Sequence, residues 1–491
     1  MSVERPAASG RSVVDVVVVG GGIAGLATAY ELHRRAVSFT LLEARTRAGG
    51  VVLSEHVDGF VIDAGPDALL VQKPDGIKLC QDLGIADRLV PTKPPRVAYI
   101  QRAGRLHPLP EASVLGIPTR WGPFLRSGLF SWSGKLRMAA ELAIPPRPPS
   151  RPSDTSHPSS VTPEDADESI GAFMRRRFGV EAAEYLAEPL LAGIHAGDVD
   201  RLSIRTLFPR FVEAERQHGS LLRAFRKAPP ARPGAVAPSD GAFRSLPGGL
   251  SELIEALLRA LPAEAIRLGR RVRRLESTDG RFLVVPETEH PVLEARVVVL
   301  ATPAFATASI VRNLDPQLAT CCDAIPYASA ATVSLAFDGS AVTRPLVGSG
   351  FVVPRREATG ILAGSWLSSK WPHRAPEGRV LMRTFIGGAR DPMALELSDA
   401  EMIRRSLTAL TPLVGITAPP LFTRVYRWER SNAQHEIGHE RRLAAIDHAL
   451  IAHPGLFLTG SGYRGVGIPD CVGDGRATAA RVVAWLDGAS Q

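Results

Sequence analysis

The stretch that decides the fold runs from Val13 to Gly25 and reads VVDVVVVGGGIAG. Its valine run is typical of a buried strand, and it leads directly into Gly20-x-Gly22-x-x-Gly25. An alanine-rich segment of helical character follows, and a second strand-like run, SFTLLE, ends at Glu43, eighteen residues past Gly25. This order of strand, glycine turn, helix and acidic residue is what a dinucleotide site needs.

Each of these residues has a physical role in such a site. Gly20 allows the tight turn from strand to helix, Gly22 leaves room for a pyrophosphate beside bare backbone, and Gly25 lets helix and strand pack closely. The helix N-terminus offers free N–H groups to the phosphates, and Glu43 lies where a carboxylate would bind a ribose hydroxyl. The motif alone does not separate NAD from FAD.

The segment after Glu43, EARTRAGG, favours a flavin dinucleotide. An arginine close to a pyrophosphate, here Arg47, and paired glycines where the chain crosses the cofactor, here Gly49 and Gly50, suit a long, buried dinucleotide. A solvated surface arginine is the alternative reading of Arg47. The block resembles the FAD signature of the amine oxidase and protoporphyrinogen oxidase superfamily.

Composition sets wider bounds. The 491 residues suffice for two or three domains, and 45% apolar with 22% charged residues are ordinary globular values. The first twelve residues show no secretory signal, and no apolar run reaches membrane-spanning length. The spacing of the four cysteines fits neither a disulfide framework nor a metal site, so we expect a reducing cytoplasm and no metal. The net charge of +8 favours solubility, an anionic ligand or an anionic membrane surface, and no pattern indicates nucleic acid.

Two stretches dense in proline, residues 145–167 and 228–241, read as loops or linkers on either side of a helical segment. Beyond them, PGGLSELIEALLRAL predicts a helix with Ser251 as its N-cap, and ARVVVLA predicts a buried parallel strand. Residues from about 325 to 430 contain strand-like pieces that predict a mixed sheet.

The C-terminus repeats the anion-binding design. LFLTGSGYRGVGIPDC reads as a strand and a glycine-rich turn, and a helix-like GRATAARVVAWL follows. In a flavoprotein, such a helix N-terminus can face the flavin pyrimidine ring and stabilise the negative charge that builds on reduction.

With this second signal, nearly the whole chain resembles the bacterial oxygen-dependent protoporphyrinogen oxidases of the FAD-dependent amine oxidase superfamily. The resemblance rests on GGGIAGLATAYEL, LLEARTRAGG, DAGPDALL, RLHPLP, GIPT, EPLLAGIHAGD, LPGGLSELIEAL, ATPA, TFIGGARD and GVGIPDC. It implies an α/β and α+β fold of the amine oxidase and p-hydroxybenzoate hydroxylase type. The FAD-binding domain would comprise residues 1–90, 242–310 and 445–491, the substrate domain 91–112 and 311–444, and an inserted helical domain 113–241.

The resemblance also implies site residues. One non-covalent FAD would contact Gly20, Gly21, Gly22, Ile23, Ala24, Gly25, Glu43, Ala44, Arg47, Gly50, Val51, Gly65, Pro66, Asp67, Ala68, Val272, Val466, Gly467 and Ile468. Arg96 fits a propionate-binding role, and Gly193 matches a glycine whose backbone lies against the macrocycle. Val352, Trp366 and Phe385 fall at the apolar walls, although Trp366 is bulkier than the aliphatic residue expected there.

The implied activity is oxidation of protoporphyrinogen IX to protoporphyrin IX in heme biosynthesis. Three hydride transfers to flavin, with O₂ reduced to H₂O₂, would remove six electrons, and no side-chain base is required. Coproporphyrinogen III is the alternative substrate. A flavin amine oxidase or carotenoid desaturase and a flavin-free escort-type protein are the rival functions. Peripheral contact of the helical domain with the inner face of the membrane, and a homodimer, are left open.

Four features admit a second reading. His435-Glu436-Ile437-Gly438-His439 is a literal HExxH motif, but Gly438 breaks the helix that a zinc site needs, so we expect structural histidines. For His195 we expect packing rather than catalysis, and for Cys321-Cys322 two small structural residues. Asp67 could serve only as a turn residue after its proline.

Overall fold

The nucleotide-binding part is built on one sheet. The computed structural model describes residues 12–110, 113–114, 116–147, 167–227 and 240–488. The sheet has the order β12-β2-β1-β15-β14-β13, with β21 also on β15. These strands are β1 Ser12–Val19, β2 Phe39–Leu42, β12 Ile266–Arg267, β13 Val272–Thr278, β14 Arg281–Pro286, β15 Leu293–Leu300 and β21 Leu456–Leu458. β1 pairs in parallel with both β2 and β15, as the buried valine runs predict.

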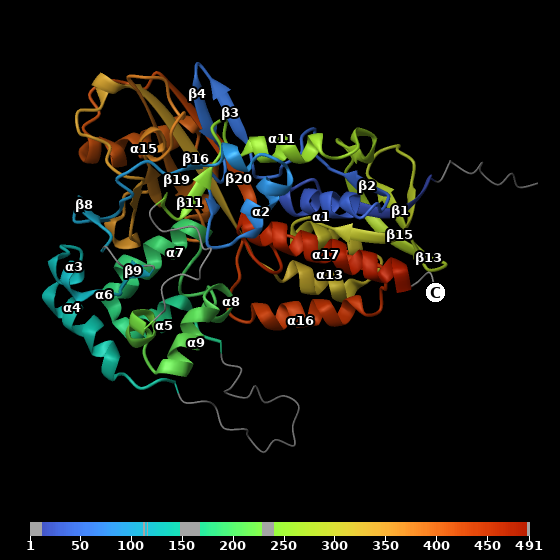
Figure 1. The fold of residues 1–491 in the computed structure, drawn as a ribbon, viewed down its shortest axis with the longest axis horizontal. Coiled ribbons are helices and arrows are strands. Elements are labelled where there is room, and N and C mark those ends of the chain that lie inside the picture. Colours follow the sequence, from blue (N-terminus) through green and yellow to red (C-terminus); the bar gives the residue numbers. More distant parts are fainter. Residues whose placement is uncertain (1–11, 111–112, 115, 148–166, 228–239, 489–491) are drawn as a thin grey trace, which may run out of the picture.

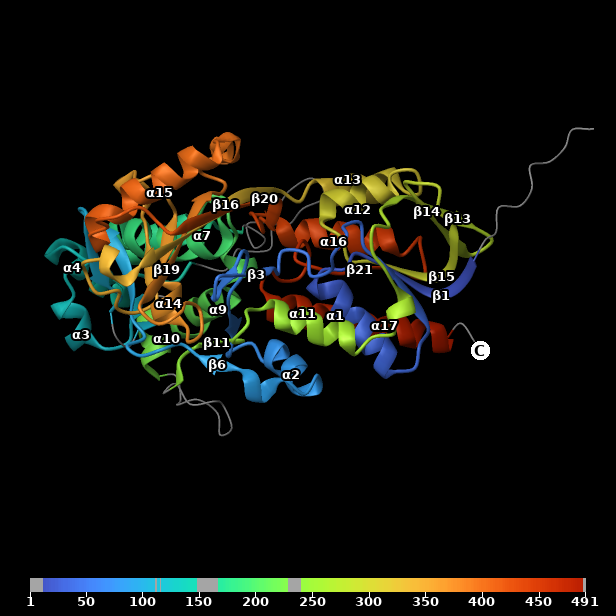
Figure 2. The ribbon, with the colours of Figure 1, turned by 90° about the horizontal axis from the view of Figure 1, so that it is seen from above.

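Helices cover both faces of this sheet (Figures 1 and 2). Val16 and Val18 pack toward one helical layer and Val17 and Val19 toward the other, because successive strand residues point to opposite faces. The first layer contains α1 Ile23–Arg34, α2 Asp75–Asp82, α11 Ser251–Arg259 and α17 Ile468–Gly488. The second contains α12 Ala304–Val311, α13 Pro316–Asp323 and α16 His439–Leu450.

A second sheet of seven strands has the order β20-β16-β19-β18-β17-β7-β8. Its strands are β7 Ala98–Arg102, β8 Arg105–Pro108, β16 Tyr327–Asp338, β17 Gly350–Val352, β18 Ala363–Ser365, β19 Arg379–Gly387 and β20 Phe422–Ala433. Helix α15, Asp399–Val414, packs on one face. The small elements are β3 Ser54–Val57, β4 Phe60–Asp63, β5 Leu69–Leu70, β6 Val90–Pro91, β9 Ser113–Val114, β10 Ile117–Pro118, β11 Phe243–Ser245 and α14 Leu367–Lys370.

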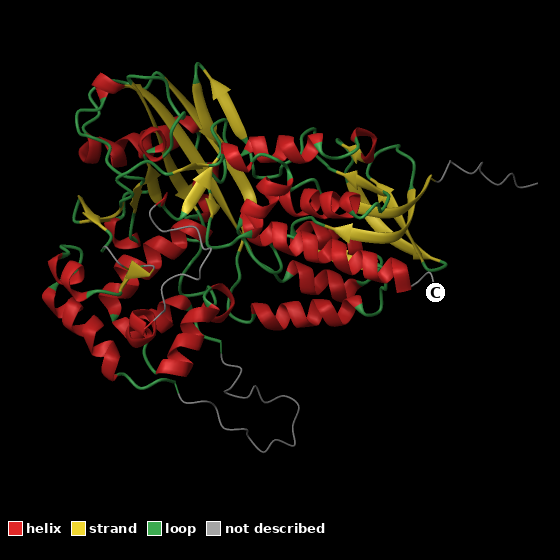
Figure 3. Ribbon diagram, viewed as in Figure 1, coloured by secondary structure: helices red, strands yellow, loops and turns green. Residues whose placement is uncertain are grey.

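The helical region is the third part, and Figure 3 shows it as a cluster of helices beneath the second sheet. Its helices are α3 Trp121–Arg126, α4 Trp132–Ala139, α5 Ile170–Phe178, α6 Val180–Ala182, α7 Glu188–His195, α8 Ile204–Leu207, α9 Pro209–His218 and α10 Leu221–Lys227. An apolar core joins them, together with a fully buried ion pair between Arg177 and Glu141.

The predicted fold class is confirmed, with mixed sheets, helices and a Rossmann-like nucleotide-binding part. The domain boundaries stay predictions. Most of each proline-rich stretch lies outside the described residues. Ser251 is not the N-cap of α11: the cap is Leu250, and the Ser251 hydroxyl instead accepts the Ser54 N–H at 2.7 Å. Within the described part of the chain, no helix is long and apolar enough to cross a membrane.

Candidate active site

The glycine turn between β1 and α1 has the geometry that its sequence predicts. Gly20 has a φ of +109°, in the region that favours glycine. A Cβ at Gly25 would lie 1.9 Å from the Gly20 carbonyl oxygen, so helix and strand pack too closely for any side chain. A Cβ at Gly22 would meet nothing within 4 Å. Gly22 is also the N-cap of α1, whose first turn has no side-chain cap and no acidic residue. The helix end therefore offers N–H groups and open space to an anion.

Glu43 is held against this turn. Its carboxylate accepts the Gly21 N–H at 2.7 Å and the Arg45 N–H at 2.7 Å, and its side chain is buried. The Arg270 N–H donates to the Glu43 carbonyl at 2.7 Å, which brings the segment leading to Val272 alongside. A cavity of about 330 Å³ lies nearby, lined by Leu42, Arg267, Arg270, Val284, Pro286, His290, Pro291 and Leu293. Glu43 and Val272, both predicted at the adenosine end, thus lie in one region.

Arg47 shapes the backbone of the segment that follows it, residues 48–52. Its guanidinium donates to the carbonyl of Gly50 at 2.7 Å, and also to those of Ala48 and Val52. Burial, together with neighbouring Arg45, lowers the Arg47 pKa. Gly49 is tied to the first turn by its N–H, which donates to the Gly21 carbonyl at 2.8 Å. Arg47 is therefore not a solvated surface residue, and its described contacts shape the backbone beside the glycine turn.

The second sheet holds the loop of residues 63–68. Arg383 donates to the carbonyls of Asp63 at 2.6 Å and Gly65 at 2.8 Å. The Thr332 hydroxyl and the Trp428 indole N–H both donate to the Ala64 carbonyl, at 2.7 and 2.9 Å. This loop carries Gly65, Pro66, Asp67 and Ala68 of the predicted cofactor set. Hydrogen-bond donors on three strands of the second sheet therefore fix the position of this loop.

Asp67 takes part in a buried ionic cluster. Its carboxylate accepts from the Lys370 ammonium at 2.8 Å and from the Trp371 indole at 3.0 Å, with Arg383 at 3.5 Å. Burial opposes ionisation, but Lys370 and Arg383 outweigh it and hold the Asp67 pKa well below its usual range. Asp67 is thus more than a turn residue: as an anion it links the loop to Lys370 and Trp371 at the end of α14.

The C-terminal turn reaches the same region. Ile468 shares a core cluster with Ala24 of α1 and with Leu69, which follows the 63–68 loop. Asp470 accepts the Gly467 N–H at 3.1 Å and the Lys73 ammonium at 2.6 Å. The first turn of α17 therefore contains a carboxylate, that of Asp470. This negative charge neutralises part of the positive electrostatic field at the helix N-terminus. The two helices that follow the glycine-rich turns, α1 and α17, therefore pack against each other although they lie at opposite ends of the chain.

One row of residues crosses the second sheet on the face opposite α15. Phe385 is the Cα partner of Thr332 and of Ala363, and Ala363 is the partner of Val352. This face of the sheet is the one toward the 63–68 loop, because the Thr332 hydroxyl donates to the Ala64 carbonyl in that loop. Helix α7, which contains Gly193, packs against β17, which contains Val352. The structure thus brings Phe385, Val352 and the helix of Gly193 together.

Trp366 does not belong to this row, which corrects its predicted place at a substrate wall. It is only 2% exposed and packs with Phe351 and residues of α15 in the core on the other face. The alternation of a strand explains the error, because Ala363 points to one face and the residue three positions later to the other.

Arg96 lies apart from these residues in the described contacts. It is exposed, and its Nε donates to the Thr92 carbonyl at 3.1 Å. No described contact joins it to Phe385 or Val352, so its role stays a prediction.

Comparison with known proteins identifies the family to which this chain belongs. Residues 23–483 match the family of flavin-containing amine oxidoreductases. The chain belongs to this family. It is 36% identical to a protein of Bacillus subtilis named coproporphyrinogen III oxidase, over 96% of this chain and 98% of that protein. It is 29% identical to a chloroplastic protoporphyrinogen oxidase of Oryza sativa, over 98% and 91%. A solved structure from Exiguobacterium, described as a candidate protoporphyrinogen oxidase, matches at a TM-score of 0.81 with 33% identity, over 97% and 100%.

Family membership makes a flavin the cofactor, and the residues present fit one. The open space at Gly22 and the uncapped start of α1 suit phosphate groups, and the buried Glu43 carboxylate suits a hydroxyl donor beside them. Arg383, Thr332 and Trp428 were missed by sequence reasoning, because no local motif marks a side chain that reaches a carbonyl from a distant strand.

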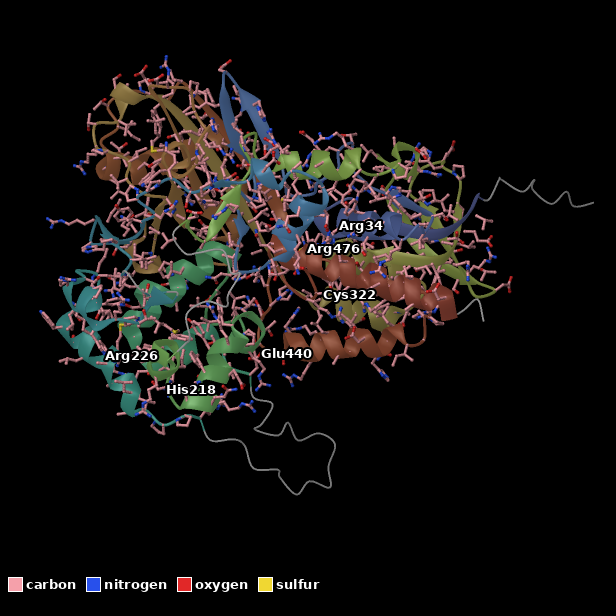
Figure 4. All side chains as sticks on the ribbon, viewed as in Figure 1. Arg34, His218, Arg226, Cys322, Glu440 and Arg476 are labelled. Atoms are coloured by element: carbon pink, nitrogen blue, oxygen red, sulfur yellow. The ribbon has the colours of Figure 1, made fainter. Side chains whose placement is uncertain are left out.

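The remaining motifs have structural surroundings. His435 lies in a loop and His439 begins α16, and no described group of three His, Cys, Asp or Glu residues could hold a metal ion. Cys322, labelled in Figure 4, lies on α13, and burial raises its pKa to about 12. Burial, with Lys73, lowers the His195 pKa to about 4, so this imidazole is neutral at pH 7.

Proposed function

We propose that this protein is an FAD-dependent porphyrinogen oxidase and that coproporphyrinogen III is its preferred substrate. The observation that carries the proposal is a near full-length match, at 36% identity, to a relative named for that activity, together with the intact glycine turn. The sequence resemblance put protoporphyrinogen IX first, and it is the second candidate. The Exiguobacterium and rice relatives favour it.

Bound FAD supplies the acceptor for a hydride from a methylene bridge of the macrocycle, and O₂ serves as the final oxidant. The chain's own residues bind and orient. The start of α1 and the backbone at Gly22 would hold the pyrophosphate, and Glu43 would hold the ribose. Arg383 fixes the 63–68 loop, which would lie beside the cofactor. No described residue is assigned as a general base.

The apolar row on the second sheet supplies the substrate surface in this proposal. Phe385 and Val352 stand on one face with the small Ala363 between them, so a flat, apolar macrocycle can lie against the row. Backbone of α7 around Gly193 would contact its other side. Exposed Arg96 would attract the propionates, which are anionic.

The experiment is an anaerobic reduction of the purified flavoprotein. With coproporphyrinogen III added in the absence of O₂, we expect the visible flavin absorption to bleach, and a slower bleach with protoporphyrinogen IX. A colourless protein that cannot be reconstituted with FAD would contradict the cofactor assignment. A bleach with an amine but with neither porphyrinogen would contradict the substrate assignment.

Peripheral membrane contact through the helical region is a further part of the proposal. Trp132, Leu136, Leu125 and Val180 are 68%, 71%, 45% and 58% exposed on neighbouring helices. The Lys135 ammonium lies 4.5 Å from the Trp132 ring centroid, but it is buried and donates to the Leu125 carbonyl at 2.7 Å. The exposed cation beside the apolar patch is Arg126, which follows Leu125. This pairing suits an anionic bilayer surface.

Co-sedimentation with anionic and neutral vesicles tests this contact. We expect binding to anionic vesicles and its loss in the double variant Trp132→Ser, Leu136→Ser. Equal recovery of wild type and variant would contradict membrane contact. A concentration-dependent dimer that the double variant abolishes would assign the patch to a homodimer instead.

A further inference from the structure

The loop between β20 and α16 runs from Gln434 to Gly438 and leads into His439, the first residue of α16; on one side it binds the helical region. The Gln434 side chain donates to the carbonyl of His195, the last residue of α7, at 2.9 Å. The Ser203 N–H donates to the His435 carbonyl, also at 2.9 Å. Figure 4 shows Glu440, the second residue of α16, at the end of that helix nearest the helical region. The loop thus joins α7 to the nucleotide-binding part.

On its other side the loop binds the segment that leads to the C-terminal turn. His435 Nε2 lies 3.1 Å from the Ser461 carbonyl oxygen, and His439 Nε2 lies 2.8 Å from that of Tyr463. A carbonyl oxygen only accepts, so each imidazole carries a proton on Nε2. The chain continues from these carbonyls to Ile468, the first residue of α17, and α17 packs against α1.

The two imidazoles form a compact pair that bulk solvent does not reach. Their ring centroids are 3.9 Å apart with an interplanar angle of 13°, and His435 and His439 are 2% and 0% exposed. His439 Nδ1 is buried with no hydrogen-bond partner. A neutral pair with one donor each satisfies both carbonyls, whereas two stacked imidazolium rings would repel each other.

We propose that His435 and His439 are positioning residues for the flavin site. They hold the 461–463 segment, and through it the backbone of residues 466–468, at the separation from α1 that the bound cofactor requires. Because the same loop holds α7 through Gln434, the pair also fixes the cofactor turn relative to the helix that carries Gly193. This inference rests on the proposed function for the identity of the ligand.

Substitution of His439 tests the proposal. Glutamine can place an N–H near the position of Nε2, whereas leucine fills the space without a donor. We expect His439→Leu to weaken FAD binding by the apoprotein about tenfold, because a buried carbonyl loses its donor. His439→Gln should restore affinity to within about threefold. His448→Gln, on the exposed side of α16, is the matched control and should change nothing.

Two readouts on the full chain separate positioning from general stability. FAD affinity is measured by fluorescence titration, and amide hydrogen exchange of residues 461–468 is followed without FAD. Faster exchange confined to that segment in His439→Leu, reversed in His439→Gln, supports the proposal. Should His439→Leu fail to fold, His435→Leu and His435→Gln make the same comparison.

Unchanged FAD affinity and unchanged exchange at 461–468 in the leucine variant would overturn the proposal. A wild-type protein that binds no FAD would instead contradict the proposed function. Exchange in the flavin-free chain would still decide whether the imidazole pair holds the turn.

Discussion

The two ends of the site are built differently. At the proposed adenosine end, Gly20, Gly25 and Gly49 approach neighbouring backbone atoms too closely for a side chain. At the proposed substrate end, Phe385 and Val352 lie on one face of the second sheet, separated by a strand that contributes Ala363. The first end is therefore intolerant of substitution, whereas the second can change its specificity without changing the fold.

The largest expected effect comes from adding one methyl group at the first end. In Gly25→Ala the Cβ would overlap the Gly20 carbonyl oxygen, which must force helix and strand apart. We expect loss of at least about 3 kcal/mol of unfolding free energy and loss of bound flavin. Denaturant unfolding measures the first and the flavin-to-protein absorbance ratio the second.

Gly22→Ala sharpens this result. Its Cβ meets no protein atom, so the variant should fold with wild-type stability and still fail to retain flavin, because the methyl group enters the pyrophosphate space. Gly122→Ala, in α3 with open space around it, is the control. Retention of full flavin by Gly22→Ala would contradict the assignment of this turn.

At the substrate end, Phe385→Ala should lower kcat/KM for the porphyrinogen by roughly ten- to a hundredfold through lost apolar contact, with flavin content unchanged. Trp366→Phe is its opposite-face counterpart. It should cost about 1–3 kcal/mol of stability and leave KM unchanged, because Trp366 packs against α15. A raised KM in Trp366→Phe alone would reverse the two assignments.

Acid should destabilise the loop that carries His435 and joins α7 to the nucleotide-binding part. Burial, with neighbouring His439, lowers the His435 pKa from 6.5 to about 3, so the unfolded chain binds the proton more tightly than the folded one. The stabilisation is present above pH 6.5 and is lost as the pH falls toward 3. Tm should therefore fall across this window, and His435→Gln should flatten the slope. An equal slope in the variant would show that other groups dominate.

The smallest effect is expected at Arg96, the exposed arginine that we propose attracts the propionates. Arg96→Gln should raise KM about two- to fivefold with kcat unchanged, because an exposed charge contributes little to binding in water. The increase should shrink as salt is added. Arg126→Gln, at an exposed arginine on α3, serves as the control, and an equal change in both variants would indicate only a net-charge effect.

The same contrast explains what the sequence could predict. The Gly20–Gly25 turn and Glu43 follow each other closely along the chain, so their spacing predicts that they lie together, and Glu43 accepts the Gly21 N–H. Ser251 and Trp366 were misplaced because capping and strand face depend on neighbours from elsewhere in the fold. Arg383 reaches the Gly65 carbonyl across 318 positions of sequence, and no local pattern records such a contact.

The most direct test of the account compares Gly22→Ala and Phe385→Ala in one anaerobic measurement of flavin content and flavin reduction by coproporphyrinogen III. We expect a folded, colourless Gly22→Ala protein and a yellow Phe385→Ala protein whose flavin is reduced more slowly than in the wild type. A yellow Gly22→Ala protein, or wild-type reduction in Phe385→Ala, would contradict the division of the site into these two ends.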